Sequence, residues 1–242
     1  MTARNKAERA MKSHFQGNAY PGRGLIIGRS ANGAAWQQVY FIMGRSPNSR
    51  NRRFRARGSV LETEPFDPSK VEDPSLIIYE AMLEFEDKFL VSNGDQTSTT
   101  YQGISQGKSF RESLKDRERE PDAPNYTPRI TGMLDLSKDD PEIALSILKA
   151  NQLDPAKTDR HFFYPGDPDI GFGYGLTTYM GDGSPLPSYT GDPLNLPLFG
   201  DPEETLERYW SALDEENRIS IAVKEILTES RASKILTRNK YH

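Results

Sequence analysis

GRGLIIGRSANGAAWQQVYFIMG, at residues 22–44, is the strongest indication of the fold in this sequence. Two runs rich in β-branched and aromatic residues flank the pair Asn32-Gly33. Asn-Gly between such runs is typical of a β-hairpin, because a tight hairpin turn needs backbone angles that these two residues adopt easily. We therefore expect strands near Arg23–Gly28 and Ala35–Met43. A third strand is expected at Arg55–Thr63, which is also rich in strand-forming residues.

Alternating residues around Tyr79 indicate a second hairpin. From residue 79 to 86, apolar side chains occupy the odd positions, and glutamates occupy the even positions apart from Met82. This period of two is typical of a strand with one buried face, and we expect the chain to turn near Glu86–Lys88. Further strands are expected in TPRITGMLDL (residues 127–136), at His161–Tyr164 and in ISIAV (residues 219–223).

Four segments have the signals of helices. Thr97–Arg119 contains long polar and charged residues and few β-branched ones. Asp139-Asp140-Pro141-Glu142 offers an N-cap, a first-turn proline and an early acid, and so predicts a helix over residues 143–151. Further helices are expected from Asp201 to about Leu213 and over Lys224–Arg238. Hairpins with separate helices predict an α+β domain with mostly antiparallel sheets covered by helices.

Two segments carry no periodic pattern of their own. Residues 1–19 are polar, with too few apolar positions to form a core, and we interpret them as an N-terminal extension. Gly166–Gly200 is a long, loop-rich segment that contains several aromatic residues. Loops of this length are often functional, and aromatic residues favour an ordered chain, so a substrate lid and a subunit contact are both open interpretations.

Composition excludes several classes of protein. The 242 residues include no Cys, which excludes disulfides, thiol nucleophiles and Cys-based metal sites, and the three His are too scattered to suggest a metal site. No apolar run has the roughly 18 residues of a membrane span, and the first residues lack the apolar core of a signal peptide. The net charge of −4 disfavours a nucleic-acid partner. We expect a cytoplasmic protein without a membrane or nucleic-acid partner, in which any anion binding is local.

The segment from Arg45 to Arg57 contains six Arg and no Lys. Arg presents a rigid planar fork that matches the oxygens of a phosphate or carboxylate, whereas a merely solvated face usually mixes Arg with Lys. Arg45 and Arg50 stand beside turn-forming Ser, Pro and Asn residues that would fix backbone amides near the same site, which favours a phosphate clamp. For the other arginines, at positions 52, 53, 55 and 57, a solvated edge strand is an equally good interpretation.

Two further segments carry polar residues that could bind a ligand, one after a predicted strand and the other at the start of a predicted strand. Ser92–Thr97 contains Asn93 and Gly94 between a strand and a helix, where backbone N–H groups can hold an anion or a heterocycle; a plain turn with a helix cap explains it equally well. Arg129 begins the strand in TPRITGMLDL, and the acids Glu118 and Glu120 precede it. Taken alone, those two acids are better explained as a charged helix end.

Four blocks, in order along the chain, together resemble the archaeal-type IMP cyclohydrolase family and its bacterial relatives. They are YPGRG (20–24), GRSPNSRNR (44–52), VSNGDQT (91–97) and NYTPRI (125–130). The resemblance covers about residues 20–223 and implies that residues 20–242 form one domain. It also implies a four-layer αββα sandwich of the N-terminal-nucleophile hydrolase type and, as its activity, ring closure of 5-formamidoimidazole-4-carboxamide ribotide to IMP with loss of water.

The resemblance also implies roles for single residues. Arg50 would stabilise the developing oxyanion, Tyr79 would transfer protons, and Glu120, with Glu118 as the alternative, would orient the amide. Candidates for substrate binding are Arg23, Arg45, Asn48, Asn93, Gly94 and Arg129. No cofactor or metal is needed, because the carboxamide nitrogen attacks the formyl carbon of the same molecule. The partner would be a purine mononucleotide substrate, and the family suggests a homo-oligomer.

Two alternatives come from other functional classes. An N-terminal-nucleophile amide hydrolase would use Thr2 after loss of Met1, although a helix-prone segment and not a strand follows it. A nucleotide- or RNA-binding protein could keep the fold and the Arg clamp without catalysis. Retention of Tyr79 and of an acid near Glu120 disfavours this second alternative.

Overall fold

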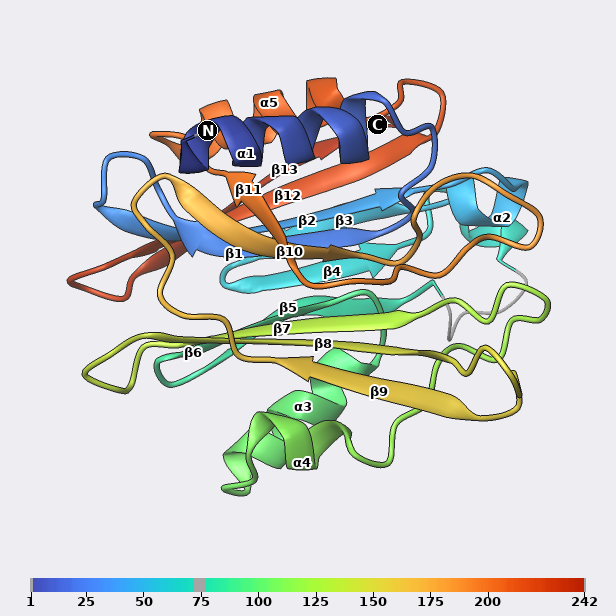
Figure 1. Ribbon diagram of the computed structural model, residues 1–242, viewed down its shortest axis with the longest axis horizontal. Coiled ribbons are helices and arrows are strands. Elements are labelled where there is room, and N and C mark those ends of the chain that lie inside the picture. The colour runs from blue at the N-terminus through green and yellow to red at the C-terminus, as the bar shows by residue number, and fades with distance from the viewer. Residues whose placement is uncertain (1, 72–76, 242) are drawn as a thin grey trace.

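The computed structural model describes residues 2–71 and 77–241 and contains two antiparallel β-sheets that face each other (Figure 1). Strands of the first sheet are β1 (Gly24–Arg29), β2 (Ala35–Met43), β10 (Phe172–Thr177), β11 (Leu194–Pro197), β12 (Arg218–Leu227) and β13 (Ser233–Asn239). Strands of the second are β3 (Arg53–Arg57), β4 (Val60–Glu64), β5 (Tyr79–Phe85), β6 (Lys88–Ser92), β7 (Arg129–Asp135), β8 (Glu142–Ala150) and β9 (Thr158–Phe163). The first sheet has the order β11-β10-β1-β2-β12-β13, and the second follows chain order.

Helices cover the outer face of each sheet (Figure 1). On the six-stranded sheet lie α1 (Ala3–Met11) and α5 (Pro202–Ala212), with the π-helix η1 (Lys12–Gln16) following α1; on the seven-stranded sheet lie α3 (Gln96–Ser105) and α4 (Phe110–Leu114). The short helices α2 (Pro47–Arg50) and η2 (Pro68–Lys70) lie in connections. The prediction of an α+β fold with mostly antiparallel sheets is confirmed. Among the described residues, no helix has the length and apolar character needed to cross a bilayer.

The main core lies between the two sheets. Leu25 and Ile27 of β1 are fully buried there and belong to the same apolar cluster as Leu134 and Leu145 of the opposite sheet. Gly132 of β7 lies where the sheets approach closely, because a Cβ at this position would stand 2.7 Å from Cδ1 of Ile27. A larger residue would force the two layers apart at this point.

Both predicted hairpins are present. In the first, β1 pairs with β2, the Ser30 N–H donates to the Ala35 carbonyl at 2.9 Å, and Gly33 has a φ of +71°. In the second, β5 pairs with β6 and the turn places Glu86 at a φ of +52°. The strands expected in residues 127–136 and 219–223 and the helix beginning after Asp201 are also confirmed.

The helix predicted over residues 143–151 is wrong, because this segment is strand β8. β8 lies between β7 and β9, with Ile143, Leu145 and Ile147 facing the other sheet and Ala144 facing the helices. A strand buried on both faces carries apolar residues almost continuously, so its sequence lacks the alternation that marks a half-exposed strand. The acids and proline before it, which resembled a helix start, form a loop.

Two other predicted elements are also wrong, and each is a hairpin of two strands in the structure. The helix expected over Lys224–Arg238 is the end of β12 and all but the last residue of β13, a hairpin on the edge of the six-stranded sheet. The single strand expected over Arg55–Thr63 is the hairpin of β3 and β4, which turns at Gly58 with a φ of +60°. In both segments long charged side chains on the exposed face obscure the period of two.

The remaining corrections concern length and packing. The helix expected over Thr97–Arg119 is divided into α3 and α4 around Gly107, and the strand expected at His161–Tyr164 begins three residues earlier. The loop-rich segment 166–200 contains β10 and β11. The polar residues 3–16 are helical, and their few apolar side chains, including Met11 and Phe15, are buried against the six-stranded sheet.

Candidate functional site

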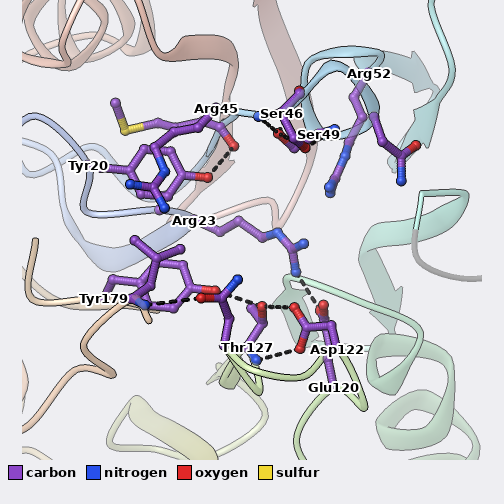
Figure 2. A pocket seen from close by; sticks show the side chains of 15 residues that line it. Tyr20, Arg23, Arg45, Ser46, Ser49, Arg52, Glu120, Asp122, Thr127 and Tyr179 are labelled. Atoms are coloured by element: carbon purple, nitrogen blue, oxygen red, sulfur yellow. Dashed lines mark hydrogen bonds and ion pairs between the residues drawn. The ribbon is translucent and has the colours of Figure 1, made fainter. Parts of the chain in front are cut away.

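A cavity of about 260 Å³ opens where β1 begins, where β2 and β10 end, and where the chain enters β7. Its walls come from residues within 20–23, 43–52, 120–127 and 179–186, four segments far apart in the sequence. In Figure 2, the side chains of Tyr20, Arg45 and Arg52 occupy one wall, those of Glu120 and Tyr179 the other, and Arg23 reaches between them. The volume is close to the lower end of the roughly 300–1,000 Å³ typical of small-molecule sites.

The first wall is a rigid turn after β2. The Ser46 N–H donates to Ser49 Oγ at 2.9 Å, and the Ser49 N–H donates to Ser46 Oγ at 3.1 Å, so the two serines cap the turn reciprocally. Arg45 packs its guanidinium over the Tyr20 ring, 4.9 Å from its centre. The same guanidinium forms an ion pair with Asp182 across the mouth of the cavity.

The opposite wall is a chain of hydroxyl groups and a carboxylate. The Thr127 N–H donates to an Asp122 oxygen at 2.6 Å, and the Thr127 hydroxyl donates to the second oxygen of that carboxylate. The Tyr179 hydroxyl lies 2.6 Å from Thr127 Oγ1 and therefore donates to it. Burial raises the pKa of Tyr179 well above its ordinary value, so this phenol remains protonated.

A buried ion pair joins the two walls. Nη1 of Arg23 contacts Oε1 of Glu120 and also donates to the Asn93 carbonyl at 3.3 Å. Only 9% of Arg23 and 3% of Glu120 are exposed. Burial alone would lower the pKa of Arg23, but the Glu120 carboxylate, together with Tyr79, Tyr40 and Tyr179, outweighs burial and holds this pKa well above its ordinary value. Glu120 therefore neutralises Arg23 and leaves no net charge on the pair.

Arg52 is a buried arginine of the cavity that forms no ion pair with the described residues. It is 6% exposed, and neither its Nε nor its Nη1 has a hydrogen-bond partner among the described residues. Burial and the nearby positive charge of Arg23 lower the pKa of Arg52. A buried charged group without partners costs several kcal/mol. Arg52 lines the cavity, so an anionic ligand bound there would supply the missing partner.

Two tyrosines lie beside these arginines. The hydroxyl oxygens of Tyr40 and Tyr79 are 2.7 Å apart, and both side chains are buried. Burial and Tyr79 raise the pKa of Tyr40 well above its ordinary value, although the positive charges of Arg23 and Arg52 oppose this rise. Tyr79 begins β5 and does not line the cavity itself.

The structure brings four of the nine predicted site residues to the cavity: Arg23, Arg45, Asn48 and Glu120. Glu118, the alternative acid, is exposed. Arg50 does not line the cavity; its Nε donates to the Gly44 carbonyl at 3.1 Å, and its Nη2 donates to Asn217 at 3.4 Å.

The other predicted residues lie behind the wall. The Asn93 side chain bridges the backbone of Pro128 and Ile130. Arg129 donates to Asp95 at 2.6 Å, and a Cβ on Gly94 would meet its guanidinium at 2.6 Å.

Sequence reasoning found Glu120 but missed Asp122, Thr127 and Tyr179 of the second wall, and it did not single out Arg52. Arg52 belongs to the arginine-rich segment, but nothing in its sequence context distinguishes it from Arg53 or Arg55, which pair with Glu64 on the surface. Tyr179 lies in the segment interpreted as a loop and carries no local signal. Only the pairing of β10 with β1 brings it to the cavity.

One family model, described as IMP cyclohydrolase-like protein, matches residues 20–230. The chain belongs to this family. Every residue that lines the cavity lies within the matched range, and the resemblance predicted from the four sequence blocks is confirmed. Membership of the IMP cyclohydrolase-like family suggests an enzyme with a small nucleotide as its substrate. No curated protein matches the chain.

Two other features bear on the chemistry of this family member. The Thr2 hydroxyl accepts a hydrogen bond from the Asn5 N–H as the N-cap of α1, is exposed, and does not line the cavity. It therefore lacks the setting of a catalytic nucleophile. Within residues 2–71 and 77–241, no group of three or more His, Cys, Asp or Glu side chains is arranged to hold a metal ion.

Proposed function

We propose that the protein is an IMP cyclohydrolase, which closes the ring of 5-formamidoimidazole-4-carboxamide ribotide to form IMP and water. The observation that carries this proposal is Arg52, a buried cation in the cavity of a chain of the IMP cyclohydrolase-like family, whose Nε and Nη1 have no partner among the described residues. The unpaired donors of Arg52 call for an acceptor oxygen from a ligand, which the formyl group of the ribotide would supply, while its phosphate would bind to Arg45. We also infer that the fold is a four-layer αββα sandwich of the N-terminal-nucleophile hydrolase type; the helices on the outer faces of both sheets support this.

Charge in the cavity favours a mononucleotide. Three guanidinium groups line it, but Glu120 neutralises that of Arg23, and the carboxylate of Asp122 is held by Thr127. We place the substrate phosphate at the mouth, between Arg45 and the hydroxyls of Ser46 and Ser49. Arg is well suited to this contact, because its planar fork matches two phosphate oxygens.

The reacting groups would then lie deeper, beside Arg52 and the Arg23–Glu120 pair. In the reaction a bond forms between the carboxamide nitrogen and the formyl carbon. The carboxamide nitrogen loses one proton and the formamido nitrogen loses the other, and a C=N bond to the formamido nitrogen replaces the formyl C–O bond. The formyl oxygen takes up these two protons and leaves as water. Arg52 would stabilise the negative charge that develops on this oxygen, and Glu120 would orient the carboxamide and hold Arg23 in place. We propose Arg52 for the role that the resemblance gave to Arg50, because Arg52 lines the cavity and two of its donor groups have no partner among the described residues.

Tyr79 stays our candidate for proton transfer. Its hydroxyl lies 2.7 Å from that of Tyr40, in the interior beside the arginines. Nucleophile and electrophile belong to one molecule, so correct alignment can supply much of the rate, with effective molarities on the order of 10⁵ M or more. The side chains then need only to move protons and stabilise charge.

The test is to mix the purified protein with 5-formamidoimidazole-4-carboxamide ribotide and follow IMP by chromatography. We expect IMP to form well above the uncatalysed rate. Arg52→Gln should reduce turnover about 100-fold or more, as expected for loss of a donor to a developing oxyanion. Arg50→Gln, which removes a charge outside the cavity, is the matched control and should reduce it far less.

Absence of IMP formation by the wild-type protein would refute the cyclohydrolase proposal. If IMP and inorganic phosphate still bind, the protein would be a nucleotide-binding member of the family without catalysis. Equal losses in Arg50→Gln and Arg52→Gln would refute the role given to Arg52, even if the wild-type protein is active.

A further inference from the structure

The N-terminal helical segment, residues 3–16, lies outside the range that matches the family, yet it reaches the strand that carries a cavity wall. It packs on the outer face of the six-stranded sheet (Figure 1). Its second part, η1, is a π-helix, a rare wide turn that is often found at functional sites. The buried residues of η1 are His14 and Phe15.

His14 begins a short chain of hydrogen bonds toward the cavity. Its Nε2 lies 2.8 Å from Oγ1 of Thr177, and the Thr177 hydroxyl donates to the Tyr179 carbonyl at 3.0 Å. A hydroxyl has one hydrogen, so the His14 Nε2–H must be the donor to Thr177. Burial lowers the pKa of His14 to about 4, so the ring is neutral near pH 7 and carries its single proton on Nε2.

The residues that His14 holds in this way support both walls. The Thr178 N–H donates to the Arg23 carbonyl at 2.9 Å, and the Arg23 N–H donates to Thr178 Oγ1 at 3.1 Å. Tyr179 follows directly, and its phenol faces the cavity. A shift of residues 177–179 would therefore move the two side chains between which the ligand lies.

We propose that His14 is a positioning residue for the cavity: it turns the Thr177 hydroxyl onto the Tyr179 carbonyl and so fixes Tyr179 and Arg23 for ligand binding. Without this N–H, nothing fixes the rotation of the Thr177 hydroxyl, and its hydrogen bond to the Tyr179 carbonyl is no longer held in one orientation. The N-terminal segment is then part of the working site. The choice of IMP and of the ribotide as probes rests on the proposed function; the geometry of Tyr179 does not.

The experiment compares His14→Leu, His14→Gln and Phe15→Leu in the full chain. Gln keeps an N–H donor. Phe15→Leu is the matched control because Phe15 is buried on the same turn and packs its ring against the rings of Phe41, Tyr209 and His14, but its side chain forms no hydrogen bond toward the cavity. We expect His14→Leu to raise the Kd for IMP and the KM for the ribotide about tenfold, the effect of losing one buried hydrogen bond, with a much smaller change in kcat. His14→Gln should restore most of the affinity, and Phe15→Leu should lower stability with Kd and KM unchanged.

A second readout does not depend on the ligand. In protein labelled with fluorotyrosine, the signal that Tyr179→Phe removes belongs to Tyr179, and we expect His14→Leu, but not Phe15→Leu, to shift or broaden it. Equal effects of His14→Leu and Phe15→Leu on affinity and on this signal would overturn the proposal. If the wild-type protein neither binds IMP nor forms it, the proposed function fails, and the fluorine signal alone decides the role of His14.

Discussion

Replacement of Arg52 by Met should stabilise the ligand-free protein while it abolishes function. Met has a similar length, fills the same buried space and needs no hydrogen bonds. Arg52 is 6% exposed, its Nε and Nη1 have no partner among the described residues, and burial and the charge of Arg23 lower its pKa. Unsatisfied buried groups cost about 1–3 kcal/mol each, and exchanging buried charges for apolar side chains gains up to about 4 kcal/mol.

We therefore expect Arg52→Met to raise the free energy of unfolding by about 2 kcal/mol. For a chain of this length that corresponds to an increase in Tm of about 4–8 °C. Arg50→Met is the control, because Arg50 is half-buried and its guanidinium is bonded to Gly44 and Asn217. Loss of those bonds should lower the free energy of unfolding by about 1–3 kcal/mol. The assay is urea unfolding of both variants and the wild-type protein at pH 7.

Ligand linkage gives the second half of this test. A ligand present at 100 times its Kd stabilises the folded state by about 2.7 kcal/mol. IMP at 100 times its wild-type Kd should therefore stabilise the wild-type protein and Arg50→Met by about this amount, and should stabilise Arg52→Met much less, because its Kd for IMP is higher. The reasoning is refuted if Arg52→Met destabilises the free protein as Arg50→Met does, or if IMP stabilises Arg52→Met as much as the wild type.

Three other perturbations have outcomes that follow from single contacts. Asp182→Asn removes the carboxylate that pairs with Arg45 at the mouth, and isothermal titration should show about two- to fivefold tighter binding of inorganic phosphate, an effect absent in an Arg45→Gln background. Gly132→Ala, whose Cβ would lie 2.7 Å from a side-chain carbon of the facing sheet, should lower the free energy of unfolding by about 1–3 kcal/mol, whereas Gly166→Ala, with nothing within 4 Å, should not. Folding lowers the pKa of His14 from 6.5 to about 4, so the buried neutral ring contributes its full stability above pH 6.5. As the pH falls from 6.5 to about 4, the free energy of unfolding should decrease by up to about 3 kcal/mol. Unfolding curves at pH 7 and 4.5 should show a smaller decrease for His14→Gln than for the wild-type protein.

Local signals in the sequence were sufficient to predict an element when the interactions that form it lie within one short segment. The β1–β2 hairpin follows from Asn32-Gly33 between two apolar runs, and the start of α5 follows from Asp201, whose carboxylate accepts the Glu204 N–H at 2.7 Å. The chemistry of the clamp was also readable, because Arg without Lys indicates binding of planar anions. The family blocks pointed to Glu120, which is buried in the cavity beside Arg23.

Long-range packing decided two features: whether residues 142–150 form a strand or a helix, and which arginines of the segment 45–57 line the cavity. Helix-start signals lie at residues 139–142, but the segment 142–150 that follows is a strand. It pairs with β7 and β9 at its two edges, and apolar side chains cover both of its faces, which selects the strand. Arg50 and Arg52 are two positions apart, yet one points to Gly44 and the other into the cavity without a partner. Tyr179 and His14 join the site only because β10 pairs with β1 and η1 packs on that sheet. Burial and partners set the charge state and reach of a side chain, and the partners are distant in the sequence: 97 positions separate Arg23 from Glu120, and 163 separate His14 from Thr177.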